Sequence, residues 1–263
     1  KALCDPDAQA VTRMKSVLVT GSAKRIGRRL ALDFAADGWD VAVHCNASIS
    51  EAEAVAAEIR GMGRRSVIVR GDLSDADVPD RLIGEASVAL GGLTCLINNA
   101  SLFEPDEVGS ITQASWAEHL DTNLRAPVFL SQAFARQLPK EHEGSIISII
   151  DQRVWKLNPK FFSYTMSKSA LWTATRTLAQ ALAPRIRVNA IGPGPALPSA
   201  RMDQAEFDKQ ARLTLLGRGT SPEEISAAVK FILSQPALTG QMIALDGGQH
   251  LVWQTPDVME VTE

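Results

Sequence analysis

Two side chains that suit proton transfer stand four residues apart at the start of a helix-length segment. Tyr164 and Lys168 begin and end the run Tyr-Thr-Met-Ser-Lys, and residues four apart on a helix share one face. A phenol has a pKa of about 10, so it transfers protons poorly at neutral pH unless its surroundings shift that pKa. A neighbouring ammonium stabilises the phenolate, and we therefore expect Lys168 to lower the pKa of Tyr164. The same spacing is also common on solvated helix faces.

A glycine-containing turn near the N-terminus is a second candidate site. Residues 20–27 read Thr-Gly-Ser-Ala-Lys-Arg-Ile-Gly and directly follow an apolar run. Such a turn between a strand and a helix lets the backbone approach a pyrophosphate, and the helix N-terminus favours its negative charge. Glycines at such turns also serve simple chain reversal, and Arg25 stands where the motif usually has its middle glycine. The residues expected around a dinucleotide here are Gly21, Ser22, Lys24, Arg25, Ile26 and Gly27.

The end of the second predicted strand bears on the choice between NAD and NADP. A dinucleotide fold that prefers NAD usually carries a carboxylate there, which holds the ribose 2′-hydroxyl. Residues 44–48 read His-Cys-Asn-Ala-Ser instead, and Asp40 lies at the opposite end of the strand. We expect donors from His44, Asn46 and Ser48, with Lys24 nearby, to accommodate a 2′-phosphate, which favours NADP(H). A merely polar loop is the alternative.

An acid also follows the third apolar run, in the sequence Gly-Asp-Leu-Ser at 71–74. At the carboxyl end of a sheet, Asp72 could accept a hydrogen bond from an adenine amine, with Leu73 beside it. Alternatively, Asp72 or Ser74 caps the next helix.

The elements that must position these residues alternate regularly along the chain. Short runs rich in β-branched residues are nearly continuous in apolar character, as in strands that are buried on both faces. Helix-length amphipathic stretches separate them, and no linker divides the chain. This pattern predicts an α/β fold with a single-domain, Rossmann-type, doubly wound parallel sheet of about seven strands and helices on both faces. The expected strands are 16–20, 40–44, 66–70, 93–97, 145–150, 186–191 and 241–245.

Local signals place the helices between these strands. Ile26, Leu30 and Phe34 share one face of the first helix, and Gly38 is expected to end it. Ser50 and Glu53 form a predicted capping box for a helix that ends at Gly61. Two longer helices are expected at 112–138 and 163–183, and Pro139 and Pro184 follow them. We divide the chain into a leader at 1–14, an NADP(H)-binding domain at 15–252 with a candidate substrate lid at 193–216, and a tail at 253–263.

Composition narrows the classes of function. The net charge of −3 provides no basic surface for nucleic acid or an anionic membrane. The three cysteines form no zinc-binding spacing, so no metal is expected, and their odd number fits a reducing compartment. No apolar run reaches the roughly 18–20 residues that span a bilayer, and residues 1–14 lack the apolar core of a signal peptide. We therefore expect a cytoplasmic protein without a membrane or nucleic-acid partner.

The combined motifs resemble the short-chain dehydrogenase/reductase family over about residues 15–250. The resemblance implies a proton relay of Tyr164, Lys168 and Asn123, in which Asn123 positions a water behind the lysine. It also implies that a cofactor lies between the turns that match the family's motifs, and that the enzyme acts on a small-molecule substrate. Members of the family usually form homotetramers, which pair through the two long helices and the last strand. The matching segments are Asn98-Asn99-Ala100, Tyr164 to Lys168, Arg187-Val188-Asn189, Pro193-Gly194 and Asp246-Gly247-Gly248, and the implied cofactor contacts include Asn99, Ala100, Ser101, Tyr164, Lys168, Pro193 and Gly194.

Two departures from the usual family pattern resemble its pteridine reductase and dihydromonapterin or dihydrofolate reductase branch. The usual serine, thirteen residues before the tyrosine, is replaced by Asp151, and the glycine turn contains Lys-Arg-Ile-Gly at 24–27. Ser101 and Phe103 fit the same branch, which places a serine and a stacking aromatic ring beside the pterin. The implied substrate contacts are Arg25, Ser101, Phe103, Asp151 and Tyr164.

Asp151 has a physical meaning apart from the resemblance. A serine hydroxyl donates to a ketone oxygen, whereas an ionised carboxylate repels it; an aspartate instead suits a heterocycle, where it relays a proton to a ring nitrogen. If Asp151 only serves as a structural hydrogen-bonding group, the chain is an ordinary carbonyl reductase, acting on 3-oxoacyl thioesters or small ketones. A third possibility is a dinucleotide-binding regulator without turnover, but the intact Tyr164, Lys168 and Asn123 argue against it.

Overall fold

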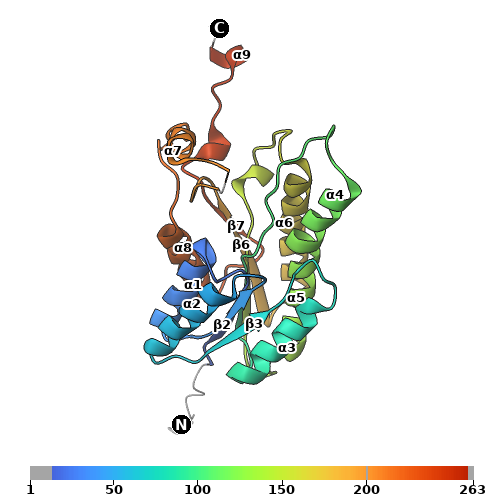
Figure 1. The fold of residues 1–263 in the computed structure, drawn as a ribbon, viewed down its shortest axis with the longest axis vertical. Coiled ribbons are helices and arrows are strands. Elements are labelled where there is room, and N and C mark those ends of the chain that lie inside the picture. Colours follow the sequence, from blue (N-terminus) through green and yellow to red (C-terminus); the bar gives the residue numbers. More distant parts are fainter. Residues whose placement is uncertain (1–13, 200, 260–263) are drawn as a thin grey trace, which may run out of the picture.

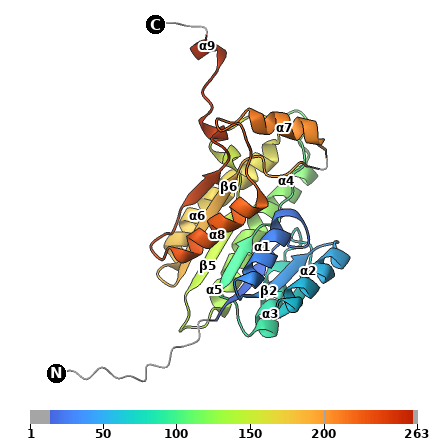
Figure 2. The same cartoon turned by 90° about the vertical axis from the view of Figure 1, so that its left-hand side faces the viewer.

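Seven parallel strands form one continuous sheet in the computed structural model, which describes residues 14–199 and 201–259. The strand order is β3-β2-β1-β4-β5-β6-β7, and helices cover both faces (Figures 1 and 2). The predicted single-domain, doubly wound fold is confirmed, and each predicted run overlaps one of the strands. The strands are β1 Ser16–Val19, β2 Asp40–Cys45, β3 Ser66–Arg70, β4 Cys95–Asn98, β5 Gly144–Ile149, β6 Ile186–Pro193 and β7 Met242–Leu245.

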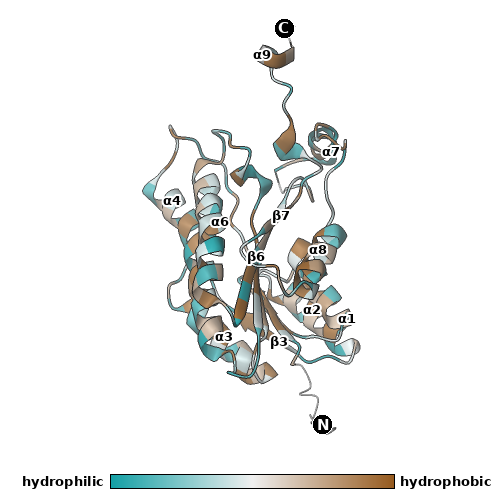
Figure 3. Ribbon diagram, turned by 180° about the vertical axis from the view of Figure 1, so that it is seen from behind, coloured by the Kyte–Doolittle hydropathy of each residue, from teal (hydrophilic) through white to brown (hydrophobic). Residues whose placement is uncertain are grey.

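The sheet separates two hydrophobic cores. Along β1, Val17 and Val19 enter one core and Leu18 enters the other, because successive side chains of a strand point to opposite faces. All three are fully buried. Figure 3 shows apolar residues concentrated along the central strands. The first core contains residues of α1 (Arg25–Ala36), α2 (Ile49–Gly61) and α8 (Pro222–Ser234), and the second contains residues of α3 (Val78–Leu90), α5 (Ala126–Gln137) and α6 (Phe162–Leu182).

Two predicted helices begin or run differently from the prediction. The capping box of Ser50 and Glu53 is wrong, because α2 already begins at Ile49 and its N-cap, Ser48, makes no side-chain capping bond. The expected helix at 112–138 is α4 (Gln113–Leu120), a π-helical turn at Asp121–Arg125, and α5. Pro127 has no N–H to donate to the carbonyl of Asn123, so a regular α-helical ladder cannot continue through this point. The wider turn places Asn123 in the buried interior.

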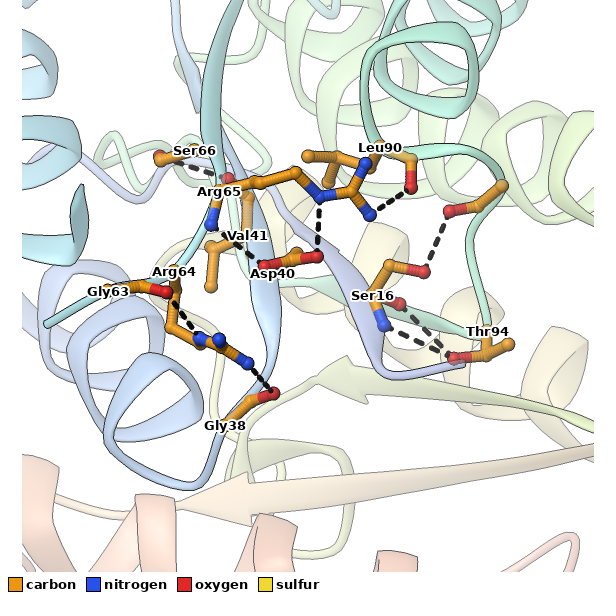
Figure 4. Close-up of polar contacts among 11 residues, drawn as sticks. Ser16, Gly38, Asp40, Val41, Gly63, Arg64, Arg65, Ser66, Leu90 and Thr94 are labelled. Atoms are coloured by element: carbon orange, nitrogen blue, oxygen red, sulfur yellow. Dashed lines mark hydrogen bonds and ion pairs between the residues drawn. The ribbon is translucent and has the colours of Figure 1, made fainter. Parts of the chain in front are cut away.

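The two ends of the sheet differ in the groups that they carry. At the amino end, Asp40 accepts hydrogen bonds from the backbone and side chain of Arg65, both at 2.8 Å (Figure 4). Asp40 therefore has a structural partner at the end of β2 that is remote from the glycine turn. The carboxyl end is overlaid by α7 (Gln204–Arg212), which belongs to the predicted lid at 193–216 (Figures 1 and 2).

The ends of the predicted divisions are only partly described. Residues 1–13 of the leader, Ala200 in the lid and residues 260–263 of the tail lie outside the described residues. A short 3-10 helix at Gln249–Leu251 precedes the tail, and the tail contains α9 (Pro256–Met259), which projects away from the sheet (Figure 2). Within the described part of the chain, no helix has the length and apolar character to cross a bilayer.

Candidate active site

The carboxyl ends of the strands open into a cavity of about 680 Å³. Its walls come from the glycine turn after β1, the segments after β4, β5 and β6, the start of α6, and α7. The cavity therefore brings together predicted cofactor and substrate residues from distant parts of the sequence. Predicted residues that line it are Arg25, Ile26, Asn99, Ser101, Phe103, Asp151, Tyr164, Lys168, Pro193 and Gly194.

Tyr164 and Asp151 face each other in this cavity. Asp151 follows β5; one of its carboxylate oxygens accepts from the Arg153 backbone N–H at 2.7 Å, and the other accepts from Tyr164 Oη at 2.9 Å. Burial raises the pKa of Asp151. Burial and the nearby Asp151 charge raise the pKa of Tyr164 well above its usual value. Both shifts favour the protonated form of the group concerned, and Tyr164 Oη donates to Asp151 within the cavity.

The expectation that Lys168 lowers the pKa of Tyr164 is corrected by this geometry. Lys168 Nζ donates to the Ile149 carbonyl at 2.9 Å and lies 5.8 Å from the centre of the Tyr164 ring. Burial itself lowers the pKa of Lys168 to about 8. Because burial disfavours the charged form of both groups, it outweighs the attraction that we expected between ammonium and phenolate.

Asn123 lies behind Tyr164 and binds the segment after β4. Its Oδ1 accepts from the Leu102 backbone N–H at 2.8 Å and from Ser101 Oγ at 3.2 Å. Its Nδ2 donates to the Leu102 carbonyl at 2.9 Å and to Ser167 Oγ on α6 at 3.1 Å. The side chain thus joins the π-helical turn, the cavity wall and the helix that carries Tyr164.

The glycine turn fits a dinucleotide because side chains are excluded from it. A Cβ on Gly27 would lie 2.2 Å from the Gly21 carbonyl oxygen, and Gly21 itself has a φ of 62°. Thr20 Oγ1 accepts from the backbone N–H groups of Asn99 and Ala100, both at 2.9 Å. This close backbone approach leaves N–H groups and a helix N-terminus as the phosphate-facing surface. Ser22 is buried and donates to the Val19 carbonyl at 2.8 Å, so it supports the turn from beneath.

Arg25 has a φ of 54°, the left-handed conformation that a glycine at this place adopts easily. Its guanidinium donates to the carbonyls of Pro198 at 2.9 Å and Leu197 at 3.4 Å. Arg25 therefore joins the glycine turn to the lid. The substitution keeps the backbone shape of the motif and adds a side chain that reaches the substrate side of the cavity.

His44 does not offer a donor to a phosphate, and this expectation is corrected. Its ring is only 2 % exposed; Nδ1 accepts from the Gly21 N–H at 2.9 Å, and Nε2 lies 3.1 Å from the Gly71 carbonyl. Burial lowers the pKa of His44 to about 4. The neutral ring supports the glycine turn from β2, and its burial could not be read from a single residue at the end of a strand.

The ends of β2 and β3, where the adenosine of a dinucleotide would lie, contain a cation that the sequence analysis missed, Arg70. Asp72 accepts from Asn46 Nδ2 at 3.0 Å and from the Ser74 backbone at 2.8 Å, so it forms a turn and does not cap α3. Arg70 is exposed and its Nε donates to the Asn46 carbonyl at 3.1 Å. Arg70 is paired with Cys45 across β2 and β3, which only a correct strand register reveals. Of the other residues expected at the cofactor, Lys24 forms an ion pair with Glu51 at 2.7 Å. Ser48 is the N-cap residue of α2, and Leu73 is buried.

Aromatic rings and arginines form the substrate side of the cavity. Phe103 stacks on Phe161, with ring centres 4.2 Å apart and planes 8° apart, and meets the edge of Tyr164 at 4.7 Å. Arg153 lies 5.4 Å over the Phe161 ring, and Arg201 pairs with Glu104 at 2.7 Å. The sequence analysis named Phe103 but missed the other three cavity residues, Phe161, Arg153 and Arg201. No local signal marks them, because long-range folding brings them together.

The turn after β6 completes the cavity. A Cβ on Gly194 would lie 2.7 Å from the Asp246 Cα, so this close contact between the ends of β6 and β7 requires glycine. Among the residues that the structure describes, no group of three or more His, Cys, Asp or Glu side chains is placed to hold a metal.

Comparison with known families decides how this arrangement is classified. A sequence profile described as short chain dehydrogenase matches residues 15–210. The chain belongs to the short-chain dehydrogenase family. Similar solved members include FolM alternative dihydrofolate reductase 1 from Brucella suis in complex with NADP, with 51 % identity, a TM-score of 0.90, and coverage of 92 % of this chain and 98 % of that one.

Other members of the short-chain dehydrogenase family are more distant. A short chain dehydrogenase from Burkholderia cenocepacia in complex with NADP has 32 % identity and a TM-score of 0.84, covering 90 % of this chain and 98 % of that one. Among curated proteins, the 3-oxoacyl-[acyl-carrier-protein] reductase FabG from Staphylococcus aureus is 32 % identical over 90 % of this chain and 98 % of its own. The chain is therefore a short-chain dehydrogenase/reductase oxidoreductase, and its substrate is a separate question.

Proposed function

We propose that this chain is an NADPH-dependent reductase of a pterin, of the dihydropterin or dihydrofolate type. The observation that carries the proposal is the 2.9 Å hydrogen bond between Tyr164 Oη and Asp151 Oδ2, where most members of the resembled family place a serine. The stacked pair of Phe103 and Phe161 supports it, because the aromatic wall that the two rings form in the cavity can pack against a planar heterocycle. The 51 % identity to a FolM alternative dihydrofolate reductase supports the same substrate class.

NADP(H) is the proposed cofactor, and the chain's own residues fit it. The glycine turn, Asn99, Ala100 and the Pro193-Gly194 turn would surround the diphosphate and nicotinamide. Lys24, which pairs with Glu51, and the exposed Arg70 would face a 2′-phosphate at the end of β2, whose own last residues carry no carboxylate to hold a ribose hydroxyl. The NADP complexes of similar solved proteins support this choice.

When bound, the dihydronicotinamide supplies the hydride, which adds to the carbon of a C=N bond. Tyr164 holds the balancing proton for the nitrogen; its raised pKa keeps the phenol protonated at neutral pH. Lys168 provides the nearby positive charge that offsets the phenolate left behind. Asp151, whose pKa burial also raises, returns a proton to Tyr164 or gives one to the ring directly. Asn123 acts from behind by fixing the Ser101–Leu102 backbone against α6.

We place this activity in residues 15–252, with 193–216 as the lid, in a cytoplasmic homotetramer. The burial of Cys45 and Cys95 as free thiols supports a reducing compartment.

Reduction of a 3-oxoacyl thioester is the second candidate, favoured by the FabG relatives at 32 % identity. A protonated Asp151 could donate to a ketone oxygen as a serine does. Against it stands the repulsion that the ionised form would exert on the same oxygen.

A substrate panel with the variants Asp151→Ser and Asp151→Asn tests the proposal. NADPH oxidation is followed with dihydrobiopterin, dihydrofolate and an acetoacetyl thioester. We expect the native protein to reduce a pterin, and Asp151→Ser to lower pterin kcat by about 100-fold, within the range of a lost proton-transfer group, while thioester turnover is spared or rises. Unchanged pterin turnover in both variants would refute the role of Asp151, and native turnover of the thioester alone would refute the substrate class.

A further inference from the structure

The segment after β4 presents alternate residues to two different surroundings. Ser101, Phe103 and Pro105 line the cavity. The residues between them bind the helices behind: the backbone of Leu102 pairs with Asn123, that of Glu104 with His119, and Asp106 with Ser163. Extended chain gives this alternation of period two. The position of the Phe103 ring is therefore set from the far side of the segment.

Asp106 supplies the missing cap of the helix that carries Tyr164. The N-cap of α6 is Phe161, at a φ of 57°, which has no side-chain oxygen. Asp106 accepts from the Ser163 N–H at 3.0 Å and from Ser163 Oγ through its other oxygen, and its carbonyl accepts from the Phe162 N–H at 3.1 Å. Asp106 is 6 % exposed and Ser163 fully buried. Asp106 thus satisfies two of the orphan N–H donors of this helix, one with its carboxylate and one with its carbonyl.

His119 on α4 completes the network and fixes its direction. Its Nε2 faces the Glu104 N–H at 3.2 Å and must accept, while its Nδ1 lies 2.9 Å from the Ser115 carbonyl and must donate. Nδ1 is also 2.8 Å from Ser163 Oγ. These partners assign the proton to Nδ1. Ser163 Oγ therefore donates to Asp106, and the Nδ1–H of His119 faces two acceptors, the Ser115 carbonyl and Ser163 Oγ.

We propose that Asp106, Ser163 and His119 are positioning residues that set the ring of Phe103 against Tyr164 and thereby determine how a substrate ring meets the proton donor. The network holds Ser163, which directly precedes Tyr164. It also holds Glu104 and Asp106, which follow Phe103 and face the helices behind the segment. The 4.7 Å edge contact of Phe103 and Tyr164 is the result. The inference rests on the proposed function only in that Tyr164 donates the proton and Phe103 contacts the substrate. The glycine turn has separate supports in Thr20 and His44.

The variant Asp106→Asn tests this network because it keeps the shape of the side chain and replaces one acceptor oxygen with a donor NH₂. If the new amide NH₂ faces the Ser163 hydroxyl, the hydroxyl hydrogen meets only donors, because the Nδ1–H of His119 remains bound to the Ser115 carbonyl. If the amide is turned over, its NH₂ meets the Ser163 N–H. Two donors face each other in either arrangement. We expect kcat to fall by about 10- to 100-fold, the scale of a small misplacement, with a raised KM for the substrate and an unchanged Kd for NADPH.

Adding Ser163→Ala to Asp106→Asn removes the hydroxyl from the conflict, because the amide oxygen can then accept from the residue-163 N–H while its NH₂ faces a methyl group. We therefore expect the double variant to recover several-fold in kcat relative to Asp106→Asn alone. Ser221→Ala is the matched control: it removes the N-cap bond of α8, from Glu224 N–H to Ser221 Oγ at 3.2 Å. It should lower Tm without changing kcat or KM.

Equal kcat and KM in Asp106→Asn and Ser221→Ala, or no recovery in the double variant, would overturn the inference and leave the network a purely structural cap. Tyr164→Phe, measured with the same substrate, separates this failure from failure of the proposed function. If Tyr164→Phe abolishes turnover and Asp106→Asn does not lower it, only the positioning role is wrong. If Tyr164→Phe turns over normally, the proton donor itself is misassigned.

Discussion

The cofactor half and the substrate half of the cavity are built from different kinds of contact. On the cofactor side, each hydrogen bond among Thr20, Gly21, Asn99 and Ala100 joins a short polar side chain to a backbone group, and a Cβ on Gly27 has no room. On the substrate side, Phe103 contacts Phe161 and Tyr164 through side chains from segments about 60 residues apart in the sequence. The first half therefore demands particular small residues at fixed spacing, whereas the second permits many combinations of side chains.

Burial acts on ionisable groups in both halves, with opposite consequences. In the cofactor half it lowers the pKa of His44 to about 4, which keeps a hydrogen-bond acceptor aimed at Gly21. In the substrate half it raises the pKa of Asp151 and Tyr164, which keeps protons available. The same desolvation thus stabilises a scaffold in one half and stores a transferable proton in the other.

The largest expected effect comes from removing the proton donor alone. Tyr164→Phe keeps the ring that packs against Phe103 and removes only the hydroxyl bound to Asp151. We expect kcat to fall by about 10³-fold, within the range for a general acid, while the Kd for NADPH, measured by fluorescence titration, stays within about twofold because the cofactor half is untouched. A variant that lost cofactor binding as well would show that the halves are not independent.

The contrast also explains how much of this protein the sequence predicts. Buried parallel strands produce continuous apolar runs, and the glycine turn and the Tyr164–Lys168 spacing are local patterns, so the fold and the position of the cavity follow from short segments. Asp151 is found in the same way, because a carboxylate replaces a hydroxyl at a fixed distance from Tyr164.

The remaining features depend on three-dimensional neighbours. Arg70 is recognisable only once β2 and β3 are in register, and Phe161 only once its ring stacks on Phe103. The pKa of Tyr164 shows the same limit: a spacing of four predicts that Lys168 is close, but not that burial dominates the result. His44 lies at a strand end where polar residues usually meet solvent, yet both ring nitrogens bind backbone groups.

A methyl group placed in the cofactor half should weaken cofactor binding more than it lowers kcat, whereas Tyr164→Phe should lower kcat and leave cofactor binding unchanged. In Gly27→Ala the new Cβ would lie 2.2 Å from the Gly21 carbonyl oxygen and 2.6 Å from Asn99 Nδ2, so the turn must shift. Overpacking costs about 1–3 kcal/mol, and we expect the affinity for NADPH to fall by about 10- to 100-fold, with a smaller change in kcat at saturating cofactor. The helical Gly84, which has no atom within 4 Å of its ideal Cβ, provides the control. Gly84→Ala should leave cofactor affinity unchanged and raise Tm slightly.

The smallest effect concerns the support that β2 gives to the glycine turn, and it is visible in acid. The pKa of His44 is about 4 in the folded protein against an ordinary value of 6.5, so between these values the unfolded chain binds a proton that the folded protein does not. The free energy of unfolding should therefore fall as pH decreases from 6.5 to 4, by up to about 3 kcal/mol.

Denaturant unfolding at fixed protein concentration, repeated across this pH range, measures the slope of the free energy of unfolding against pH. His44→Asn, whose amide oxygen can still accept from the Gly21 N–H, should flatten it. If the free energy of unfolding of His44→Asn depends on pH as steeply as that of the native protein, another group destabilises the fold in acid. Burial of His44 in the cofactor half would then not have the role described for it.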